Sequence, residues 1–378
     1  MRIVFVIKEI GTGGGQPQDV ALTIKTLSII HNDWEFYVIA KYVYDTLPET
    51  LKDLHSRLIV EKKYYSLLLF NWRFTRLLSG FDFIYIKGQF PYVIPAIKSK
   101  RPSLLVMYQQ DSPLLYSRIL TRLQIFGSNA LRKFIVRRMK NIVTVSEDLA
   151  DFYERKYGIR PKVIEDQINS EFYSAGFRKS LNDENAIKLL TVGAWDGPNG
   201  RKRQHIVVKY FSEAVKKEGR LRLTMVGLSE GNISFFKAMV KELNVNDYVT
   251  LKASMTEQEL RDEYLSNDIF VTATSYEGFY RPIVEAFASG MPALVFDSRT
   301  VVNDASMNAS VNHVIKSGGG RLYTDPESFY SSIMDILDHY GDLSRRGHDY
   351  SMKFKPENIG KKLVTLIDEI LESEKRMS

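Results

Sequence analysis

A run of sixteen residues that begins at Glu277 places two carboxylates around a turn and a helix start. It reads Glu-Gly-Phe-Tyr-Arg-Pro-Ile-Val-Glu-Ala-Phe-Ala-Ser-Gly-Met-Pro, so that Glu277 and Glu285 are eight positions apart. Pro282 suits the first helical position and Gly290 suits the end, which predicts Glu285 in the first turn. The unpaired N–H groups and the dipole of a helix start favour an anionic diphosphate, and a carboxylate beside them accepts hydrogen bonds from neutral hydroxyls. The spacing predicts a site for a nucleotide-linked sugar.

Three consecutive cations, Arg201, Lys202 and Arg203, follow a strand-like run over 188–192 and precede a helical pattern. A loop between strand and helix lies at the same edge of a parallel sheet as the predicted helix start, so its cations can neutralise a diphosphate. The alternative for these side chains is ordinary solvated surface charge.

A glycine loop, Gly11-Thr-Gly13-Gly14-Gly15, follows the first strand-like run, a setting in which the backbone can approach a phosphate closely. Gln16 stands where a dinucleotide fingerprint has its third glycine, and the second strand-like run ends without an acidic residue. These two departures disfavour NAD. A flexible turn is the alternative reading of this loop.

The elements around these loops alternate between strand-like and helical patterns, which predicts parallel sheets flanked by helices. We expect strands over 2–8, 34–40, 83–87, 104–108 and 141–145, then over 188–192, 222–226, 249–251, 269–272 and 293–296. Helices are expected over 17–30, 204–217, 234–243, 257–266 and 356–371. The polar stretch over 165–186 is predicted to be the crossing between two domains. The expected domains are residues 1–170 and 187–355, with residues 356–378 as a separate last helix.

Composition sets the broad class. The chain has 378 residues, of which 44% are hydrophobic and 26% charged, as in a globular protein of two domains. No cysteine is present, so disulfides, thiolate nucleophiles and cysteine-ligated zinc are excluded. The six histidines form no ligand-spaced pair, and we expect no metal site. Neither a signal peptide nor a membrane span is indicated, so we expect a cytoplasmic protein.

The basic residues concentrate in the first half of the chain. Between Asp111 and Glu147 no acidic residue occurs, and cations recur among apolar residues at helical spacing over 118–140. Residues 62–78 also mix cations with Tyr, Phe and Trp, a pattern typical of a helix at a bilayer interface. We predict that this half binds the anionic inner face of the membrane peripherally; packed helices with a solvated basic face are the alternative. No nucleic-acid-binding motif accompanies the charge, so we expect no nucleic-acid partner.

The pattern E-G-F-x-R-P-x-x-E-A-x-A-x-G-x-P resembles the donor-site signature of the retaining GT-B glycosyltransferases of family 4, also called glycosyl transferases group 1. The resemblance implies an α/β fold of two Rossmann-like domains that face each other across a cleft, with the last helix crossing back to the first domain. It also implies transfer of a sugar from a nucleoside-diphosphate sugar to a hydroxyl of a glycan. The basic first half adds the expectation that this acceptor is polyprenyl-linked or otherwise lipid-linked. No divalent ion or other cofactor is expected.

The same resemblance assigns roles to single residues. It implies that Glu285 binds the donor ribose and Glu277 the donor sugar, with Lys202 and the backbone N–H groups of residues 278–280 on the diphosphate. The predicted catalytic residues are Glu277, Lys202 and Gln110. The predicted donor-binding residues are Gly13, Gly14, Gly15, Arg201, Arg203, Gly278, Phe279, Tyr280, Arg281 and Glu285.

Two positions depart from the family pattern. The family's Arg after the glycine of the 188–192 strand is Ala194 here, so Arg201 or Arg203 is expected to supply that charge. The family's His beside the donor sugar is Gln110, which can hydrogen-bond a hydroxyl but cannot carry a proton at neutral pH. Retaining enzymes of this family are described as using the departing diphosphate as proton acceptor, so no side-chain base is required. The departures leave open a catalytically silent sugar-binding subunit, or a nucleotide-sugar epimerase or glycan phosphorylase on the same scaffold.

Overall fold

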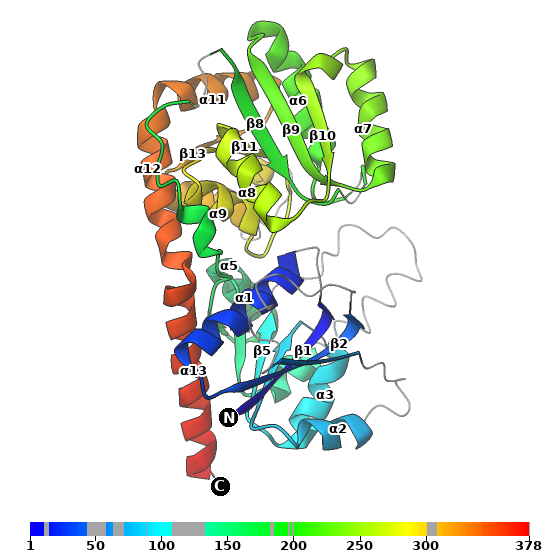
Figure 1. Cartoon of the computed structure of the whole chain (residues 1–378), viewed down its shortest axis with the longest axis vertical. Helices are drawn as coiled ribbons and strands as arrows, with labels where there is room; N and C mark the ends of the chain where they lie inside the picture. The colour runs from blue at the N-terminus through cyan, green and yellow to red at the C-terminus, as the bar shows by residue number, and fades with distance from the viewer. Residues whose placement is uncertain are drawn as a thin grey trace. The chain divides into compact units, whose positions relative to one another are not determined.

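The computed structural model describes residues 1–10, 15–43, 58–62, 72–88, 90–107, 133–181, 185–195, 197–198, 200–300 and 308–377. The chain forms two compact units, each with its own sheet (Figure 1). Unit 1 consists of Met1–Gln167 and Pro356–Ser378, and unit 2 of Ile168–Lys355. Three of the predicted site residues, Gly13, Gly14 and Gln110, lie outside the described residues.

Unit 1 is built on a parallel sheet whose described strands follow the order β3-β2-β1-β4-β5-β6-β7. The chain moves outward from β1 in one direction and then returns to continue from β4 in the other, which is the doubly wound arrangement. The strands are β1 (Arg2–Ile10), β2 (Glu35–Val43), β3 (Leu58–Lys62), β4 (Phe83–Lys87), β5 (Ser103–Met107), β6 (Ile142–Thr144) and β7 (Lys162–Val163).

The last helix of the chain packs against the first helix of unit 1 (Figure 1). Gly360 permits this contact, because a Cβ atom there would lie 2.4 Å from Cγ2 of Thr26. The expectation that the last helix returns to the first α/β unit is confirmed. The described helices of unit 1 are α1 (Gly15–Ile30), α2 (Trp72–Leu78), α3 (Phe90–Ser99), α5 (Glu147–Tyr157) and α13 (Pro356–Met377).

Unit 2 repeats the doubly wound arrangement, with parallel strands in the order β10-β9-β8-β11-β12-β13. All four residues of β11 are buried, as expected for a central strand that helices cover on both faces. The strands are β8 (Ile187–Val192), β9 (Leu221–Leu228), β10 (Val249–Ala253), β11 (Ile269–Thr272), β12 (Ala293–Phe296) and β13 (Gly320–Tyr323).

The helices of unit 2 cover both faces of its sheet (Figure 1). One core joins α6 (Gln204–Lys217), α7 (Glu230–Glu242) and α11 (Pro326–Asp338) to the strands. On the opposite face, the ring of Phe270 in β11 lies 6.2 Å from the ring of Tyr264 in α8. The start of α12 (Tyr340–Ser351) also joins this core through Tyr340 and Leu343. The other helices are α8 (Glu257–Ser266), α9 (Arg281–Ala288) and α10 (Ala309–Ser317), with 3-10 turns η3 (Ser170–Tyr173), η4 (Asn246–Tyr248), η5 (Ser298–Thr300) and η7 (Met352–Phe354).

Most of the segment predicted to be an irregular crossing over 165–186 falls in unit 2, because unit 2 begins at Ile168, whereas residues 165–167 belong to unit 1. Arg178 anchors this segment to unit 2, because its guanidinium donates hydrogen bonds to the backbone carbonyls of Tyr264 and Asn267 at the end of α8. It also donates to the carbonyl of Ser289, which closes α9. A single side chain therefore caps the carboxyl ends of two helices.

Candidate donor site in unit 2

The order of strands in unit 2 sets the position of the site. The central neighbours β8 and β11 are the strands from which the chain departs in opposite directions, so their carboxyl ends flank a crevice suited to ligands. The loop over 193–203 follows β8, and the loop over 273–280 follows β11. Both predicted clusters of charged residues lie in these two loops.

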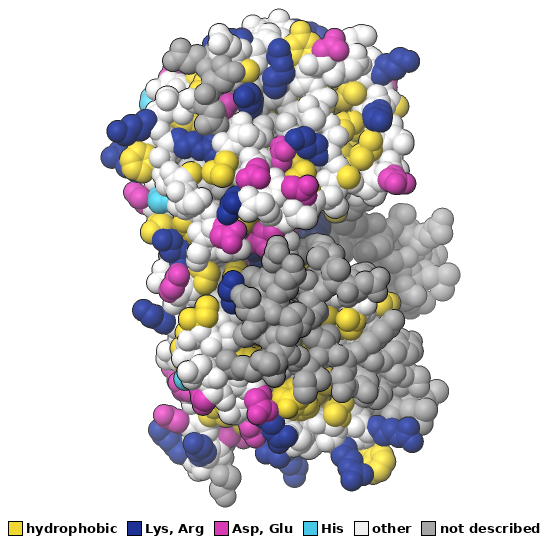
Figure 2. All heavy atoms as spheres, viewed as in Figure 1, with side chains coloured by type: hydrophobic (Ala, Val, Ile, Leu, Met, Phe, Trp, Pro, Cys, Tyr) yellow, Lys and Arg dark blue, Asp and Glu magenta, His cyan; other side chains and the backbone are white. Residues whose placement is uncertain are grey.

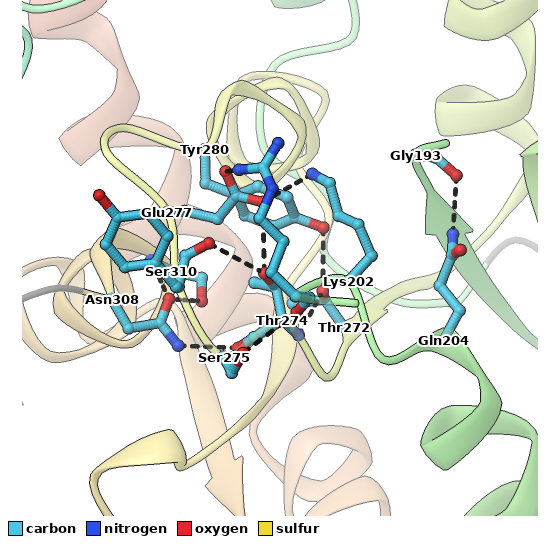
Figure 3. A network of polar contacts seen from close by, with 12 residues as sticks. Gly193, Lys202, Gln204, Thr272, Thr274, Ser275, Glu277, Tyr280, Asn308 and Ser310 are labelled. Carbon is cyan, nitrogen blue, oxygen red and sulfur yellow. Dashed lines mark hydrogen bonds and ion pairs between the residues drawn. The ribbon is translucent and has the colours of Figure 1, made fainter. Parts of the chain in front are cut away.

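The β8 loop begins with a close backbone approach. Gly193 has a φ of 144° and Gly227, at the same edge in β9, has a φ of 91°. A Cβ atom on Gly227 would lie 3.2 Å from the carbonyl carbon of Gly193, so a side chain there would push the two strands apart. The amide nitrogen of Gln204 donates to the Gly193 carbonyl over 2.8 Å, which fixes the turn (Figure 3).

Glu277 forms the centre of a charged cluster that joins the two loops (Figure 3). Its carboxylate lies 2.6 Å from Nζ of Lys202 and 2.9 Å from Nη1 of Arg201, and it accepts a hydrogen bond of 3.2 Å from the hydroxyl of Thr274. Burial raises the pKa of Glu277, but the charges of Lys202 and Arg201 outweigh burial and hold the pKa below its usual value. Glu277 is therefore ionised at neutral pH.

Backbone contacts hold the cluster in place. The N–H group of Ser275 donates to the carbonyl of Arg201 over 2.9 Å, so the two loops are also joined through their main chains. On the other side, the N–H group of Ala309 at the start of α10 donates to the Glu277 carbonyl over 3.1 Å. The amide of Asn308 donates to the Thr274 carbonyl over 2.8 Å (Figure 3). These bonds limit how far Glu277 can move relative to Lys202.

The two helices that begin at this edge, α6 and α9, have no side chain capping their amino ends. Their N-cap residues, Arg203 and Tyr280, have φ angles of 47° and 62°, although neither is a glycine. Side chains do cap α7, α8 and α10 in the same unit, through Ser229, Thr256 and Asn308. At this edge two helices thus begin without a side-chain cap, each after a non-glycine residue whose positive φ costs conformational free energy.

The side chains of the two N-cap residues have different neighbours. The ring of Tyr280 lies under Lys202, with Nζ 4.6 Å from the ring centroid, and its hydroxyl meets the hydroxyl of Thr272 at 2.9 Å (Figure 3). The guanidinium of Arg203 instead stacks over the ring of Phe296 at 4.8 Å, and burial lowers its pKa. The structure brings Lys202 and Arg201 to Glu277, but not Arg203.

Glu285 lies in the second turn of α9, which corrects the prediction of the first turn. The helix begins at Arg281 because Tyr280 has the left-handed backbone of an N-cap residue, so Glu285 is the fifth helical residue. Its side chain is 5% exposed and accepts a hydrogen bond of 3.1 Å from the hydroxyl of Tyr264. Nε of Arg281 lies 3.4 Å from the other carboxylate oxygen. Burial raises the pKa of Glu285.

The remaining predicted residues of this run, Phe279 and Arg281, are buried in unit 2. Sequence reasoning missed Thr274, Asn308 and His313, which hold the loop after β11. Asn308 had a recognisable signal, because Asn followed by Ala and Ser before an apolar helical pattern indicates an N-cap. Nothing in the sequence places Thr274 or His313 there.

The described parts of the chain contain neither a cluster of metal ligands nor a membrane-spanning helix. Within them, no three side chains of His, Asp or Glu gather closely enough to hold a metal ion. No described helix is both long and apolar enough to cross a bilayer.

The architecture is that of the GT-B glycosyltransferases. The crystal structure of HepE from Anabaena in complex with UDP superposes with a TM-score of 0.73 at 15% identity, covering 98% of this chain and 100% of that one. Residues 175–317 match the family model described as "Glycosyl transferases group 1". Within these residues the chain therefore matches the group 1 glycosyltransferases, the family that its sequence pattern resembles.

Two curated relatives extend this comparison. Mannosylfructose-phosphate synthase of Agrobacterium fabrum is 27% identical over 177 residues, which are 43% of this chain and 37% of the relative. The O-antigen chain mannosyltransferase RfbU of Salmonella typhimurium is 26% identical over 232 residues, 61% of this chain and 60% of the relative. The matches thus span less than two thirds of each relative.

Proposed function

We propose that the chain is a retaining glycosyltransferase of family 4, which moves a sugar from a nucleoside-diphosphate sugar to a hydroxyl of a glycan. The observation that carries this proposal is the cluster of Lys202, Arg201 and Glu277 between two uncapped helix starts at the crevice of unit 2. Among the described contacts, Lys202 and Arg201 both meet the carboxylate of Glu277, at an edge where the starts of α6 and α9 also favour an anion.

We assign the diphosphate of the donor to these two cations. Lys202 and Arg201 would contact its oxygens while the backbone N–H groups of residues 278–280, just before α9, donate from the other side. Arg201 is our candidate for the charge that the family places at residue 194, because its guanidinium already stands beside Lys202 and Glu277. Arg203 is held over Phe296, so its contribution to donor binding would be the smaller one. Gly13, Gly14, Gly15 and Gln110 keep their predicted roles toward the donor.

The reaction would proceed without a side-chain base in this cluster. A carboxylate whose pKa is held low by two cations is a weak proton acceptor, which suits Glu277 to hydrogen-bonding the donor sugar rather than to general base catalysis. The departing diphosphate would accept the proton of the attacking hydroxyl, and the cations and helix starts would stabilise its developing charge. Glu285 would bind the ribose hydroxyls.

The same cations would make a divalent ion unnecessary. Lys202, Arg201 and the helix starts supply the positive charge that Mg²⁺ provides in other phosphoryl-leaving-group reactions. We therefore propose metal-independent transfer. Turnover in excess EDTA should equal turnover in Mg²⁺, and a rate that returns only with the metal would refute this part.

The acceptor is proposed to be a glycan on a lipid carrier such as a polyprenyl phosphate, held at an anionic membrane surface. Two aromatic side chains of unit 1 support this, because Trp72 is 71% exposed and Phe134 is 48% exposed. The guanidinium of Arg76 lies over the ring of Trp72, and that of Arg138 lies over the ring of Phe134. In Figure 2, Lys and Arg side chains surround a hydrophobic side chain in the region where Figure 1 shows α2. Aromatic rings among cations suit the headgroup region.

Sedimentation with anionic vesicles at low salt tests the membrane contact. The full chain should sediment with vesicles that contain phosphatidylglycerol and remain in solution with neutral ones. Trp72→Ser combined with Phe134→Ser should reduce the bound fraction several-fold, and Phe177→Ser, an exposed aromatic of unit 2, is the matched control. Equal sedimentation of all forms would remove the membrane from the proposal.

A thermal-shift screen against UDP-, GDP- and ADP-sugars tests the donor, because a ligand that binds only the folded state raises its apparent stability. The selected nucleotide sugar is then incubated with glycan acceptors and the products are analysed for anomeric configuration. Binding followed by transfer with retention supports the proposal. Binding without turnover would favour the silent subunit, and interconversion of the free nucleotide sugar would favour the epimerase.

A further inference from the structure

His313 lies in α10, behind the loop that joins β11 to α9. Its side chain is buried, and each ring nitrogen has a partner: Nε2 lies 2.6 Å from the carbonyl oxygen of Phe279, and Nδ1 lies 2.9 Å from the hydroxyl of Tyr350 in α12. A carbonyl can only accept, so Nε2 carries the proton and donates it to Phe279. Nδ1 then accepts from the Tyr350 hydroxyl, which selects this tautomer.

The ring stays neutral over the whole working range of pH. Burial and the nearby charges of Lys353 and Lys316 lower the pKa of His313 to about 3, although its bond to the Phe279 carbonyl acts in the opposite direction. The hydrogen bond to Phe279 is therefore constant under physiological conditions. His313 acts as a fixed donor, with no change of charge in that range.

This donor acts on the segment that carries Glu277 and the start of α9. Phe279 stands between Glu277 and Tyr280, and α10 holds the segment at two points. The N–H group of Ala309 bonds the carbonyl of Glu277, and one turn later His313 bonds the carbonyl of Phe279. Both bonds come from one helix, so together they set the direction of the chain as it enters α9.

Aromatic packing completes the support. The rings of His313 and Phe354 both meet the ring of Phe279 edge-on, at centroid distances of 5.1 Å and interplanar angles of 86° and 80°. Tyr350 in turn lies edge-on to Phe354 at 5.4 Å. The hydroxyl of Tyr350 is thus itself fixed, and the chain of contacts from α12 through His313 to the loop contains no exposed side chain that could rearrange easily.

We propose that His313, oriented by Tyr350, is a positioning residue of the donor site, which holds the Glu277–Tyr280 loop so that Glu277 meets Lys202 and the start of α9 faces the diphosphate. This inference rests on the proposed function, because it assigns the loop to donor binding. Packing alone would make any apolar side chain of similar size an adequate substitute. Positioning by a hydrogen bond requires an N–H donor at the place of Nε2.

Two substitutions separate these possibilities. His313→Leu fills the space without a donor, whereas the amide of His313→Gln can place an N–H near the position of Nε2. Tyr350→Phe keeps the ring and removes only the hydroxyl that selects the tautomer. His339→Gln, at an exposed histidine between α11 and α12, is the matched control. Thermal denaturation of each variant first establishes which forms are folded at the assay temperature.

Binding and turnover are measured with the nucleoside diphosphate and nucleotide sugar that the screen selects. His313→Leu should weaken nucleoside-diphosphate binding and raise the KM for the donor by about tenfold or more. His313→Gln should recover to within about threefold of wild type, with Tyr350→Phe in between. Equal affinities of all folded variants, with changes only in Tm, would overturn the proposal.

Hydrogen exchange measured without ligand distinguishes a failure of the His313 inference from a failure of the proposed function. In His313→Leu and not in His313→Gln, peptides over 273–287 should exchange faster, while peptides of α7 should be unchanged. If wild type binds no nucleoside diphosphate, the proposed function fails, and exchange still decides whether His313 holds the loop. If wild type binds but exchange and affinity are insensitive to the donor at residue 313, only the present inference fails.

Discussion

Both units carry a group of three charged side chains near the carboxyl ends of their central strands, and the summed charge of the three has opposite sign in the two groups. In unit 1, Lys87 at the end of β4 forms ion pairs with Asp19 of α1 and with Asp166. One cation faces two carboxylates there. In unit 2, two cations, Lys202 and Arg201, contact the carboxylate of Glu277.

The two groups also differ in their access to solvent. The side chain of Lys87 is 3% exposed, and burial lowers its pKa while the charges of Asp166 and Asp19 outweigh burial and raise it. In unit 2 the side chains of Lys202 and Arg201 are 14% and 29% exposed. A ligand from solvent can reach the cations of unit 2 but not that of unit 1.

The neighbours of the unit 1 group indicate a structural role. Gln167, next to Asp166, donates from Nε2 to the hydroxyl of Thr23 over 2.9 Å and accepts from the hydroxyl of Thr26 over 2.8 Å. Lys87 and Gln167 together tie the end of β4, helix α1 and the last residues before unit 2 into one network. The comparison teaches that one group braces its unit, whereas the cations of the other group are more accessible, which supports the proposal that they bind an anionic ligand.

The largest expected effect is on the stability of unit 1. Lys87→Met leaves two buried carboxylates without their cation, which should cost about 3–5 kcal/mol in the free energy of unfolding. Urea denaturation measures this loss, and Lys98→Met, at an exposed lysine of α3, is the control. A loss no greater than that of the control would contradict the bracing role.

The next effect is on catalysis in unit 2. Lys202→Met should lower kcat by about 10²–10³-fold, because it removes a cation from the developing charge of the diphosphate. The free energy of unfolding should fall less than in Lys87→Met, since Glu277 keeps its contacts with Arg201 and Thr274. Initial rates and urea midpoints test both parts. If stability fell as much as in Lys87→Met while kcat was unchanged, the two groups would share one role.

A smaller effect is expected at Glu285. Glu285→Ala removes the carboxylate assigned to the ribose, and lost hydrogen bonds to a charged acceptor are worth about 1.5–3 kcal/mol. Binding of the nucleoside diphosphate should weaken about ten- to hundredfold, with kcat affected less than in Lys202→Met. Calorimetric affinities equal to wild type would remove the ribose from Glu285.

The smallest effects concern the pH dependence of stability. The pKa of Glu277 is lowered, so its contribution is present above the unfolded value of about 4.3 and is lost as pH falls through the folded pKa. The pKa of Glu285 is raised, so its contribution is present below about 4.3 and is lost as pH rises through the folded pKa. The stability difference between wild type and Glu277→Gln should become smaller as pH falls from 7 to 3. The difference between wild type and Glu285→Gln should become smaller as pH rises from 3 to 7. Urea midpoints across this range would contradict the assignment if both differences changed alike.

The sequence was most informative where local signals were strong. The helices over 204–217 and 257–266 and the strands over 83–87, 269–272 and 293–296 have the predicted bounds. Thr256 with Glu259 forms a capping box at one of these starts. Short strands were missed when their composition carried no signal: β13, for example, begins with Gly320 and Arg321. The predicted basic helices over 62–78 and 118–140 lie largely outside the described residues.

The site shows the limit of sequence reasoning more clearly. Glu277 and Glu285 were found because the pattern around them is local. The choice of Arg201 over Arg203 as the partner of Glu277 depends on an N-cap residue with a positive φ, which turns Arg203 toward Phe296. Lys87 ends an apolar strand and would be taken for an exposed charge, because its partners lie 68 and 79 positions away. Such pairings are set by packing between elements.

One calorimetric measurement tests the central claim, that Lys202 and Arg201 of unit 2 bind a diphosphate. The nucleoside diphosphate selected by the thermal-shift screen is titrated into wild type, Lys202→Met and Lys87→Arg at the same pH and salt. The account predicts saturable binding to wild type and Lys87→Arg, and an affinity at least tenfold lower for Lys202→Met. Equal affinity of wild type and Lys202→Met would contradict it.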